Sequence, residues 1–430
     1  MMNSPQQVPI IYNLFPRLAG IMPTWREHIE RAVSMGFNWL FINPVLYPGF
    51  SGSLYAVKDY YRINPDFLPP GAEGDGLPVL EQLLRTCNDM GISPIMDLVI
   101  NHTAMDNPLT QTHPNWYVRD DNGKIISPFA RDPDDPEKIT VWGDLAEIDN
   151  ENSSDKQNLW NYWTDLVLFY LKLGFTGFRC DAAYKVPAEL WTHLISEANK
   201  IATDTVFFAE ILGGAKEETL VLQDAGLHYF FNSSKWWDFT APWCLQQHEE
   251  FGQIAPSISF PETHDTSRLA ADTDGNEALQ RQRYIFSAIF SAGLMMPIGY
   301  EFGFKKQLHV VNTHPDDWET PSFNLVEFIR RVNRFKIEHQ LFHGEGHFKE
   351  IINNDSILIL ERSNEQLPRQ KGWILVNKDQ KKQVSPPLKK IILGQQHRFY
   401  RLCSDTSPIT GEPVVPQNLI LYPSEVAIIC

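Results

Sequence analysis

Four apolar, strand-like segments of the chain end in side chains that can carry or transfer a charge. The segments are Asp97–His102, Gly177–Asp181, Val206–Glu210 and Ser259–Asp265. Two carboxyl groups held close together can act as a nucleophile and as a general acid, which is the chemistry that cleaves a sugar acetal. A buried parallel strand is normally built from Val, Ile, Leu and Phe, so four such strands with charged ends predict a single rim of catalytic groups.

The elements that would carry this rim follow one repeated order: a helix, a glycine and a short buried strand. Apolar residues recur at helical spacing from Leu159 to Leu173, Gly174 follows, and a strand is expected near Phe178. The same order surrounds Gly36, Gly91 and Gly226. Alternating helices and buried strands indicate a parallel sheet wrapped by helices. Eight strand candidates, from Ile10–Tyr12 to Met295–Ile298, favour a closed (β/α)8 barrel over an open sheet.

Two segments interrupt this order and predict additional domains. Residues 103–153 are rich in Asp, Asn, Pro and Trp and are too long for an ordinary loop, so we expect an insertion after the third strand that overhangs the barrel mouth. Residues 345–430 contain short apolar pieces separated by polar turns, at 357–360, 373–376, 391–393 and 426–429, which is typical of a small antiparallel β-domain. Residues 1–102 and 154–344 would then form the barrel.

Composition restricts the possible partners. Of 430 residues 43% are hydrophobic, enough for a sizeable core, and 37 basic against 53 acidic residues give a formal net charge of −16. Such an acidic surface repels phosphate backbones and anionic headgroups, so nucleic acid and membrane partners are not expected. No basic residue precedes Arg17, the uncharged run 284–300 is interrupted by Gly293 and Pro297, and the five cysteines are scattered. We therefore expect no secretory signal and no membrane span, and predict a cytoplasmic location.

The four charged segments resemble the four signature regions of the α-amylase family of glycoside hydrolases and transglycosylases, glycoside hydrolase family 13, in the order and at the spacing of that family. The segment Tyr55–Asn64 resembles the family's region after the second barrel strand, and Gly293–Gly303 resembles the region at the eighth. The resemblance extends over essentially the whole chain. It implies an α-glucan substrate and a retaining mechanism with a covalent glycosyl-enzyme intermediate.

The resemblance also implies a role for each residue of the rim. Asp181 corresponds to the nucleophile and Glu210 to the acid/base, two groups that retention requires to lie about 5–5.5 Å apart. Arg179 lies two residues before Asp181, hence on the same face of the strand, and would orient the nucleophile and keep it ionised. Glu210 must begin protonated, so burial and nearby negative charge must raise its pKa.

Further residues of the family pattern would bind the sugar. Asp265 corresponds to a carboxylate that grips sugar hydroxyls, His102 and His264 to hydrogen-bonding residues, Tyr55 to an aromatic on which the sugar ring stacks, and Arg268 to a further contact. Four tryptophans, Trp116, Trp142, Trp236 and Trp237, are candidates for stacking platforms. No cofactor is required by this chemistry. Family members often bind calcium, and Asn101 and Glu147 match two of the six to eight oxygen ligands that such an ion takes.

Several alternatives stay open at this stage. The segment Asp181–Lys185 lacks the Lys-His ending of typical starch-degrading members, so hydrolysis and transglycosylation of α-1,4-glucosidic bonds in maltodextrin or glycogen-type chains are both compatible with the motifs. A maltosyltransferase with a sugar-phosphate donor would need a basic pocket, for which Lys185, Arg268 and Lys305 are the candidates. A catalytically inactive glycan-binding or scaffolding subunit is a third possibility. The sequence predicts neither a preferred chain length nor an oligomeric state.

Overall fold

A closed barrel of eight parallel strands lies at the centre of the computed structural model, which describes residues 8–131, 137, 139–391, 393–394, 396–403, 409–415 and 419–430. The barrel strands are β1 (Ile10–Leu14), β2 (Trp39–Ile42), β5 (Ser93–Leu98), β10 (Gly177–Cys180), β11 (Val206–Glu210), β12 (Tyr229–Phe231), β13 (Ser257–Ser259) and β14 (Gly293–Pro297). Pairing of β1 with both β14 and β2 closes the ring. The predicted (β/α)8 barrel is confirmed.

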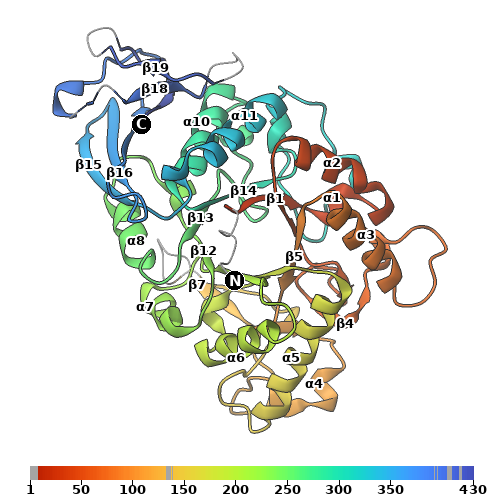
Figure 1. Ribbon diagram of the computed structural model, residues 1–430. Helices are drawn as coiled ribbons and strands as arrows, with labels where there is room; N and C mark the ends of the chain where they lie inside the picture. Colours follow the sequence, from red (N-terminus) through yellow and green to blue (C-terminus); the bar gives the residue numbers. More distant parts are fainter. Residues whose placement is uncertain are drawn as a thin grey trace.

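Helices surround the barrel (Figure 1). The longer ones are α2 (Arg26–Ser34), α3 (Leu77–Asp89), α5 (Lys156–Leu173), α6 (Ala188–Asn199), α8 (Trp243–Phe251), α10 (Glu277–Phe290) and α11 (Val326–Glu338), and α7 (Lys216–Leu220) is short. The buried positions of α5, such as Leu159, Trp163 and Leu166, recur at the helical period that the sequence predicted. Gly174 follows α5 with φ of 128°, a left-handed conformation that ends the helix and turns the chain toward β10. Among the described residues, none of the helices combines the length and the apolarity that a bilayer crossing needs.

The interior of the barrel changes from apolar to polar along the strands. Ile11, Phe41 and Ile95 belong to a buried apolar cluster. Because side chains alternate along a strand, residues two positions further on face the same interior, and Asp97 on β5 is such a residue. The register pairs Asp97 with Arg179 on β10. The polar residues therefore gather at the carboxyl ends of the strands, above an apolar layer.

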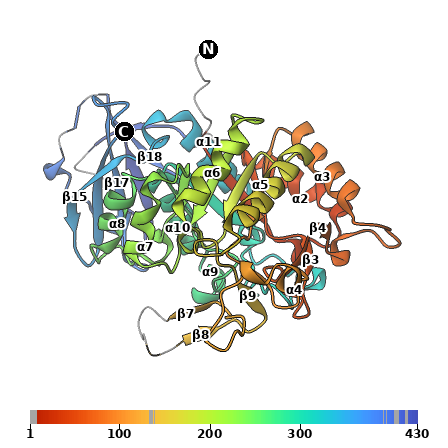
Figure 2. The same cartoon turned by 90° about the horizontal axis from the view of Figure 1, so that it is seen from below.

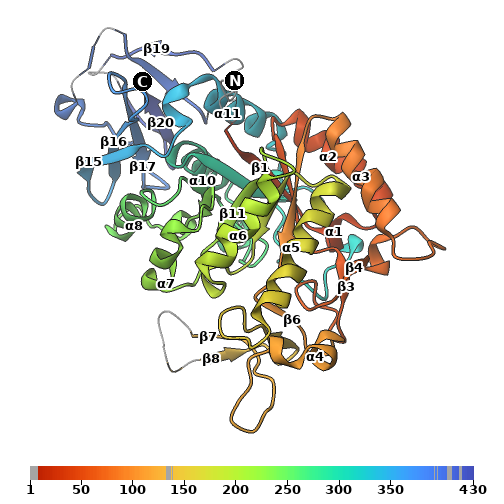
Figure 3. The ribbon, with the colours of Figure 1, turned by 60° about the horizontal axis from the view of Figure 1, so that its bottom comes forward.

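The insertion begins where β5 ends. Strand β6 (His102–Ala104) pairs antiparallel with β9 (Leu145–Glu147), and between them lie α4 (Leu109–Thr112) and a hairpin of β7 (Phe129–Arg131) and β8 (Ile139–Val141). Figure 3 shows this hairpin and α4 projecting beyond the barrel. A second small sheet, of β3 (Leu46–Pro48) and β4 (Val57–Ile63), follows β2.

The C-terminal region forms one antiparallel sheet with the strand order β15-β16-β17-β20-β18-β19, beside α8 and α10 (Figure 2). Its strands are β15 (His347–Asn353), β16 (Ile357–Ser363), β17 (Lys371–Asn377), β18 (Arg398–Arg401), β19 (Glu412–Pro413) and β20 (Val426–Ile429). The strand predicted at 391–393 is wrong at both of its described residues: Ile391 follows a 3-10 turn, Leu388–Lys390, and neither Ile391 nor Leu393 belongs to a strand. Residue 392 lies outside the described residues.

Candidate active site

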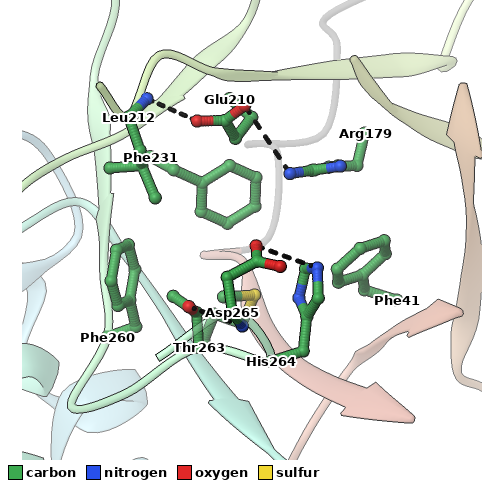
Figure 4. Close-up of a pocket in the computed structure, with 10 residues that line it drawn as sticks. Phe41, Arg179, Glu210, Leu212, Phe231, Phe260, Thr263, His264 and Asp265 are labelled. Atoms are coloured by element: carbon green, nitrogen blue, oxygen red, sulfur yellow. Dashed lines mark hydrogen bonds and ion pairs between the residues drawn. The ribbon is translucent and has the colours of Figure 1, made fainter. Parts of the chain in front are cut away.

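A groove of about 580 Å³ opens at the carboxyl ends of the barrel strands. Its lining residues include Tyr55 from the segment between β3 and β4; Asn101, His102, Pro128, Phe129, Trp142, Asp144 and Glu147 from the insertion and the residues before it; Arg179 on β10 and Glu210 on β11; Asp181, Tyr184 and Lys185 after β10; and Trp236, Thr263 and Asp265 after β12 and β13. Apart from the candidate tryptophans and phosphate-binding cations, every predicted site residue except His264 and Arg268 is among the lining residues. His264 lines a smaller cavity, which shares Arg179, Glu210 and Asp265 with the groove (Figure 4).

Arg179 is the centre of the charge network at the floor of the groove. Its Nη1 donates to Asp97 Oδ1 at 2.8 Å and to Asp181 Oδ1 at 2.5 Å, and its Nη2 lies 3.7 Å from Glu210 Oε2. All four side chains are nearly buried, so the charges interact with little screening by solvent. One guanidinium therefore aligns three carboxyl groups. Asp97 had no role at the sequence level, although an aspartate inside the apolar strand β5 is a signal that could have identified it.

Glu210 is held by main-chain amides. Ala182 N donates to Oε2 at 2.9 Å, and Leu212 N donates to Oε1 (Figure 4). Ala182 directly follows Asp181 and has φ of 40°, an unusual left-handed conformation for a residue other than glycine, which suits a functional turn. Burial raises the pKa of Glu210 to about 7, with a contribution from Asp181, while Arg179 and the two amides oppose the shift. This is the direction that a general acid requires.

His264, Asp265 and Tyr55 form a connected wall beside this floor. His264 Nε2 lies 3.0 Å from Asp265 Oδ2 and 2.7 Å from the Tyr55 hydroxyl. The Asp265 side chain is 58% exposed, so its carboxylate can reach a ligand in the groove. His102 Nε2 lies 3.2 Å from the Tyr55 carbonyl oxygen. Burial lowers the pKa of both histidines below its usual value, so both rings are neutral at pH 7.

Arg268 does not face the groove, unlike the position that the resemblance implied. It is 1% exposed, and its Nη1 forms a buried ion pair with Glu262 Oε1 at 2.7 Å. Its Nη2 donates to the carbonyl of Ile298 at 2.8 Å, just beyond β14. Arg268 therefore ties two segments of the barrel together. Arg268 is close in sequence both to Glu262, its partner in the structure, and to Asp265, which lines the groove. The sequence alone therefore did not show whether the Arg268 side chain would pair with Glu262 or reach a sugar in the groove.

We expect Arg268→Met to destabilise the protein without weakening substrate binding. The change leaves Glu262 as a buried, unpaired charge, which costs about 3–5 kcal/mol in the free energy of unfolding. Urea unfolding measures this loss, and the KM for maltoheptaose should stay within about twofold of the native value. Adding Glu262→Met should recover part of the lost stability. A large rise in KM at native stability would instead place Arg268 in contact with the sugar.

The two residues predicted as calcium ligands, Asn101 and Glu147, both line the groove. Asn101 Oδ1 is buried and has no hydrogen-bond partner, which leaves this oxygen free to bind a cation. Glu147, however, faces the positive charge of Lys185, which opposes the rise that burial causes in the pKa of Glu147. The described residues contain no cluster of three or more His, Cys, Asp or Glu side chains suited to a metal. Calcium takes six to eight oxygen ligands, of which Asn101 and Glu147 could supply two.

The predicted cations and tryptophans divide between the groove and the rest of the protein. Lys185 lines the groove, and its Nζ is bound to Glu218 at 3.0 Å; Lys305 is not among the lining residues. Trp116 and Trp237 are buried, whereas Trp142 and Trp236 are 42% and 49% exposed and line the groove. Phe129 joins them from the hairpin of the insertion, and no sequence signal had distinguished it.

Trp142→Ala and Trp236→Ala should each weaken the binding of long substrates. An aromatic contact of this kind contributes about 0.5–1.5 kcal/mol, so we expect the KM for maltoheptaose to rise by about two- to thirteenfold with little change in kcat. Steady-state kinetics test this. Tyr422→Ala is the control, because Tyr422 is an equally exposed aromatic (54%) in the C-terminal region. Unchanged KM in both tryptophan variants would contradict a stacking role.

Known proteins share sequence similarity with this chain. Residues 5–122 match the family model of the glucanotransferase domain of glycogen debranching enzyme. The chain is 24% identical over 365 residues to an α-1,4-glucan:maltose-1-phosphate maltosyltransferase of Burkholderia pseudomallei, covering 83% of this chain and 31% of that protein. It is 23% identical over 402 residues to α-amylase 2 of Dictyoglomus thermophilum, covering 88% of this chain and 67% of that protein. The chain thus spans less than a third of the maltosyltransferase's length.

Solved structures share the fold. The α-amylase of Geobacillus thermoleovorans, determined with acarbose, has a TM-score of 0.75 at 16% identity and covers 100% of this chain and 99% of its own. An α-amylase from Anoxybacillus has a TM-score of 0.76 at 15% identity, with the same coverage of 100% and 99%. At such identities the likeness establishes the architecture.

Proposed function

We propose that this chain is an enzyme of the α-amylase family and that it cleaves α-1,4-glucosidic bonds of maltodextrin or glycogen-type α-glucans with retention, through a covalent glycosyl-enzyme intermediate. The observation that carries this proposal is the arrangement of three carboxyl groups around Arg179 at the floor of the groove. In it, Asp181 is paired directly with the guanidinium, while Glu210 lies farther from it and has its pKa raised to about 7 by burial. Two carboxyl groups in different electrostatic environments suit a nucleophile and an acid.

In the first step, Asp181 attacks the anomeric carbon and Glu210 gives its proton to the glycosidic oxygen. The ion pair with Arg179 uses Asp181 Oδ1, which leaves Oδ2 for the attack. The bond from the anomeric carbon to the leaving oxygen breaks as the bond to Asp181 forms, and the departing sugar keeps the proton. Glu210 is then an ionised carboxylate.

In the second step, Glu210 acts as a base. It takes a proton from water, or from a hydroxyl of another sugar, and the resulting oxygen nucleophile attacks the anomeric carbon. The bond to Asp181 breaks and both carboxyl groups return to their starting protonation states. Asp265, His102, His264 and Tyr55 would bind the sugar at the reacting centre, which their position around the floor supports.

No step needs a cofactor, and none involves calcium. The acidic surface and the five free cysteines also support the proposed cytoplasmic location. We further propose the domain division predicted from the sequence, with an insertion over residues 103–153 and a β-domain over 345–430. The presence of the carboxyl groups, and of the arginine that aligns them, argues against a catalytically inactive glycan-binding or scaffolding subunit.

A maltosyltransferase is the second candidate, supported by the similarity to the Burkholderia enzyme. The charges of the groove favour a neutral substrate over a sugar phosphate. Among the described lining residues, the acidic side chains are Asp144, Glu147, Asp181, Glu210 and Asp265, and the basic ones are Arg179 and Lys185, both already paired with carboxylates. A phosphate group would therefore meet net repulsion.

Product analysis of the native enzyme and of Glu210→Gln decides between these functions. Maltoheptaose is supplied alone and together with maltose 1-phosphate. We expect shorter maltooligosaccharides from maltoheptaose, lost in the variant, with no release of phosphate. Longer chains formed together with inorganic phosphate would establish the maltosyltransferase. Longer chains without phosphate would indicate transglycosylation between neutral sugars, and native enzyme that changes neither substrate would refute the proposed function.

A further inference from the structure

We propose that two buried asparagines, Asn13 and Asn43, are positioning residues that orient the Tyr55 hydroxyl toward Asp97 and thereby align Arg179 with the nucleophile. This inference rests on the proposed function, because it assigns the asparagines to the reaction that Asp181 carries out. Neither asparagine contacts the groove, so neither touches the substrate. They act through Tyr55, whose position in the sequence pattern implied only a stacking role.

The two asparagines occupy a place where apolar residues are expected. Asn13 lies on β1 and Asn43 directly follows β2, and both are 0% exposed. Interior positions of such barrels are usually filled by branched apolar side chains. Asn13 Oδ1 has no hydrogen-bond partner, which is a cost that an apolar side chain would avoid. A pair kept at a cost to stability calls for a role other than packing.

The orientation of both amides follows from their partners. Asn13 Nδ2 donates to the Phe41 carbonyl oxygen at 3.2 Å and to Asn43 Oδ1 at 2.8 Å. Turning the Asn13 amide over would place its oxygen against the Phe41 carbonyl, so the amide is held in one orientation. Since Asn43 Oδ1 faces Asn13, its Nδ2 faces the other way and donates to the Tyr55 hydroxyl at 3.0 Å.

The Tyr55 hydroxyl has one hydrogen to give and three polar neighbours. Asn43 can only donate to it, and the other two neighbours are Asp97 Oδ2 and His264 Nε2, each at 2.7 Å. His264 Nδ1 is buried without a partner, so the ring hydrogen is assigned to Nε2, where acceptors are present. The single hydrogen on Nε2 lies between the Tyr55 hydroxyl and Asp265 Oδ2, which is 3.0 Å away. Neither Asn43 Nδ2 nor the protonated His264 Nε2 can accept a hydrogen bond, so the Tyr55 hydrogen is left for Asp97.

The chain of donors ends at the nucleophile. Asp97 receives Tyr55 on Oδ2 and Arg179 on Oδ1, at 2.7 and 2.8 Å, and the same Arg179 Nη1 also donates to Asp181. If Tyr55 turned its hydrogen elsewhere, Asp97 Oδ2 would lose its donor and would draw the guanidinium away from Asp181. The asparagine pair thus extends the alignment of Arg179 back to the main chain of β2.

A double-mutant cycle between Asn43 and Tyr55 tests this inference. Asn43→Asp keeps the shape of the side chain but replaces the donor by an acceptor, which attracts the Tyr55 hydrogen. We expect kcat on maltoheptaose to fall by about tenfold, the effect of one misdirected buried hydrogen bond. In a Tyr55→Phe background, which has no hydroxyl to misdirect, the same substitution should change kcat by less than about twofold.

Asn333→Asp is the matched control. Asn333 is also 0% exposed and bonded to a tyrosine hydroxyl, that of Tyr284 at 2.7 Å, but it lies on α11 away from the groove. It should lower the Tm and leave kcat near native, in either Tyr55 background. If Asn43 had a purely structural role, Asn43→Asp would change kcat by the same factor in the native and in the Tyr55→Phe background, as we expect for Asn333→Asp. That result would overturn the inference. Asn43→Ala replaces Asn43→Asp in the same cycle if the latter does not fold.

Failure of the proposed function is recognised separately. Native enzyme without turnover on any α-glucan would refute that function. The same four proteins would then be compared by urea unfolding, where coupling between Asn43 and the Tyr55 hydroxyl supports the orienting part of the inference. Additive losses of stability would overturn it.

Discussion

Asp181→Asn should lower the kcat of maltoheptaose cleavage by about four orders of magnitude or more. The amide has nearly the shape of the carboxylate but cannot form the covalent intermediate, so the first step loses its nucleophile. Arg179 still has Asp97 as a partner, so the floor of the groove should keep its structure. Binding of maltoheptaose, measured by calorimetry, should therefore change far less than turnover.

The loss should be specific to this carboxyl group. Asp155→Asn is a suitable control, since Asp155 accepts a hydrogen bond from Trp116 and is not among the residues that line the groove. Asp155→Asn should retain most of the native kcat.

A more specific test of the nucleophile uses Asp181→Gly with azide and an α-maltosyl fluoride. Azide entering the space of the missing carboxylate should yield the β-glycosyl azide, with inversion. Native-like turnover in Asp181→Asn would remove this residue from the mechanism.

Glu210→Gln should lower kcat on maltoheptaose by about 10²- to 10⁴-fold, the usual contribution of general acid–base catalysis. Its effect should depend on the leaving group. With a dinitrophenyl α-maltoside as substrate, the dinitrophenolate leaves without needing a proton, so the first step should still occur in the variant. The glycosyl-enzyme should then accumulate, which would be seen as a burst of dinitrophenolate. Azide needs no base, and it should release the intermediate as the α-glycosyl azide, with retention. Glu210→Gln and Asp181→Gly thus give azides of opposite configuration, which separates the two roles.

The same residue should set the alkaline side of the pH profile. A general acid works only while protonated, and the Glu210 pKa is about 7, so kcat/KM of the native enzyme should fall as the pH rises above about 7. This limb should be absent from the residual activity of Glu210→Gln. Glu301→Gln is the matched control: Glu301 is also fully buried beside an arginine, Arg31, but is not among the groove-lining residues. Glu301→Gln should show the same fall in kcat/KM above about pH 7 as the native enzyme. If this fall disappeared in Glu301→Gln, the result would argue against Glu210 as the acid.

The barrel and the location of the catalytic rim could be predicted because both follow from patterns of residues that are close together in the sequence. Left-handed glycines end the helices, and short runs of branched and aromatic residues form the strands that follow. Since the strands are parallel, residues at their carboxyl ends must meet at one end of the barrel. The order of Asp181, Glu210 and Asp265 along the chain was therefore enough to place them around one groove.

What only the tertiary structure decided is which side chains face that groove and what holds them. Arg268 turned to Glu262 and Ile298, and of four tryptophans two are buried and two line the groove. The partners of a long side chain are set by packing between segments that are distant in sequence, which a local pattern does not contain. The hydrogen bonds of Tyr55 show this best, because its partners come from the residue after β2, from β5 and from the segment after β13. The sequence determined the reacting groups; the closed barrel determined how they are aligned.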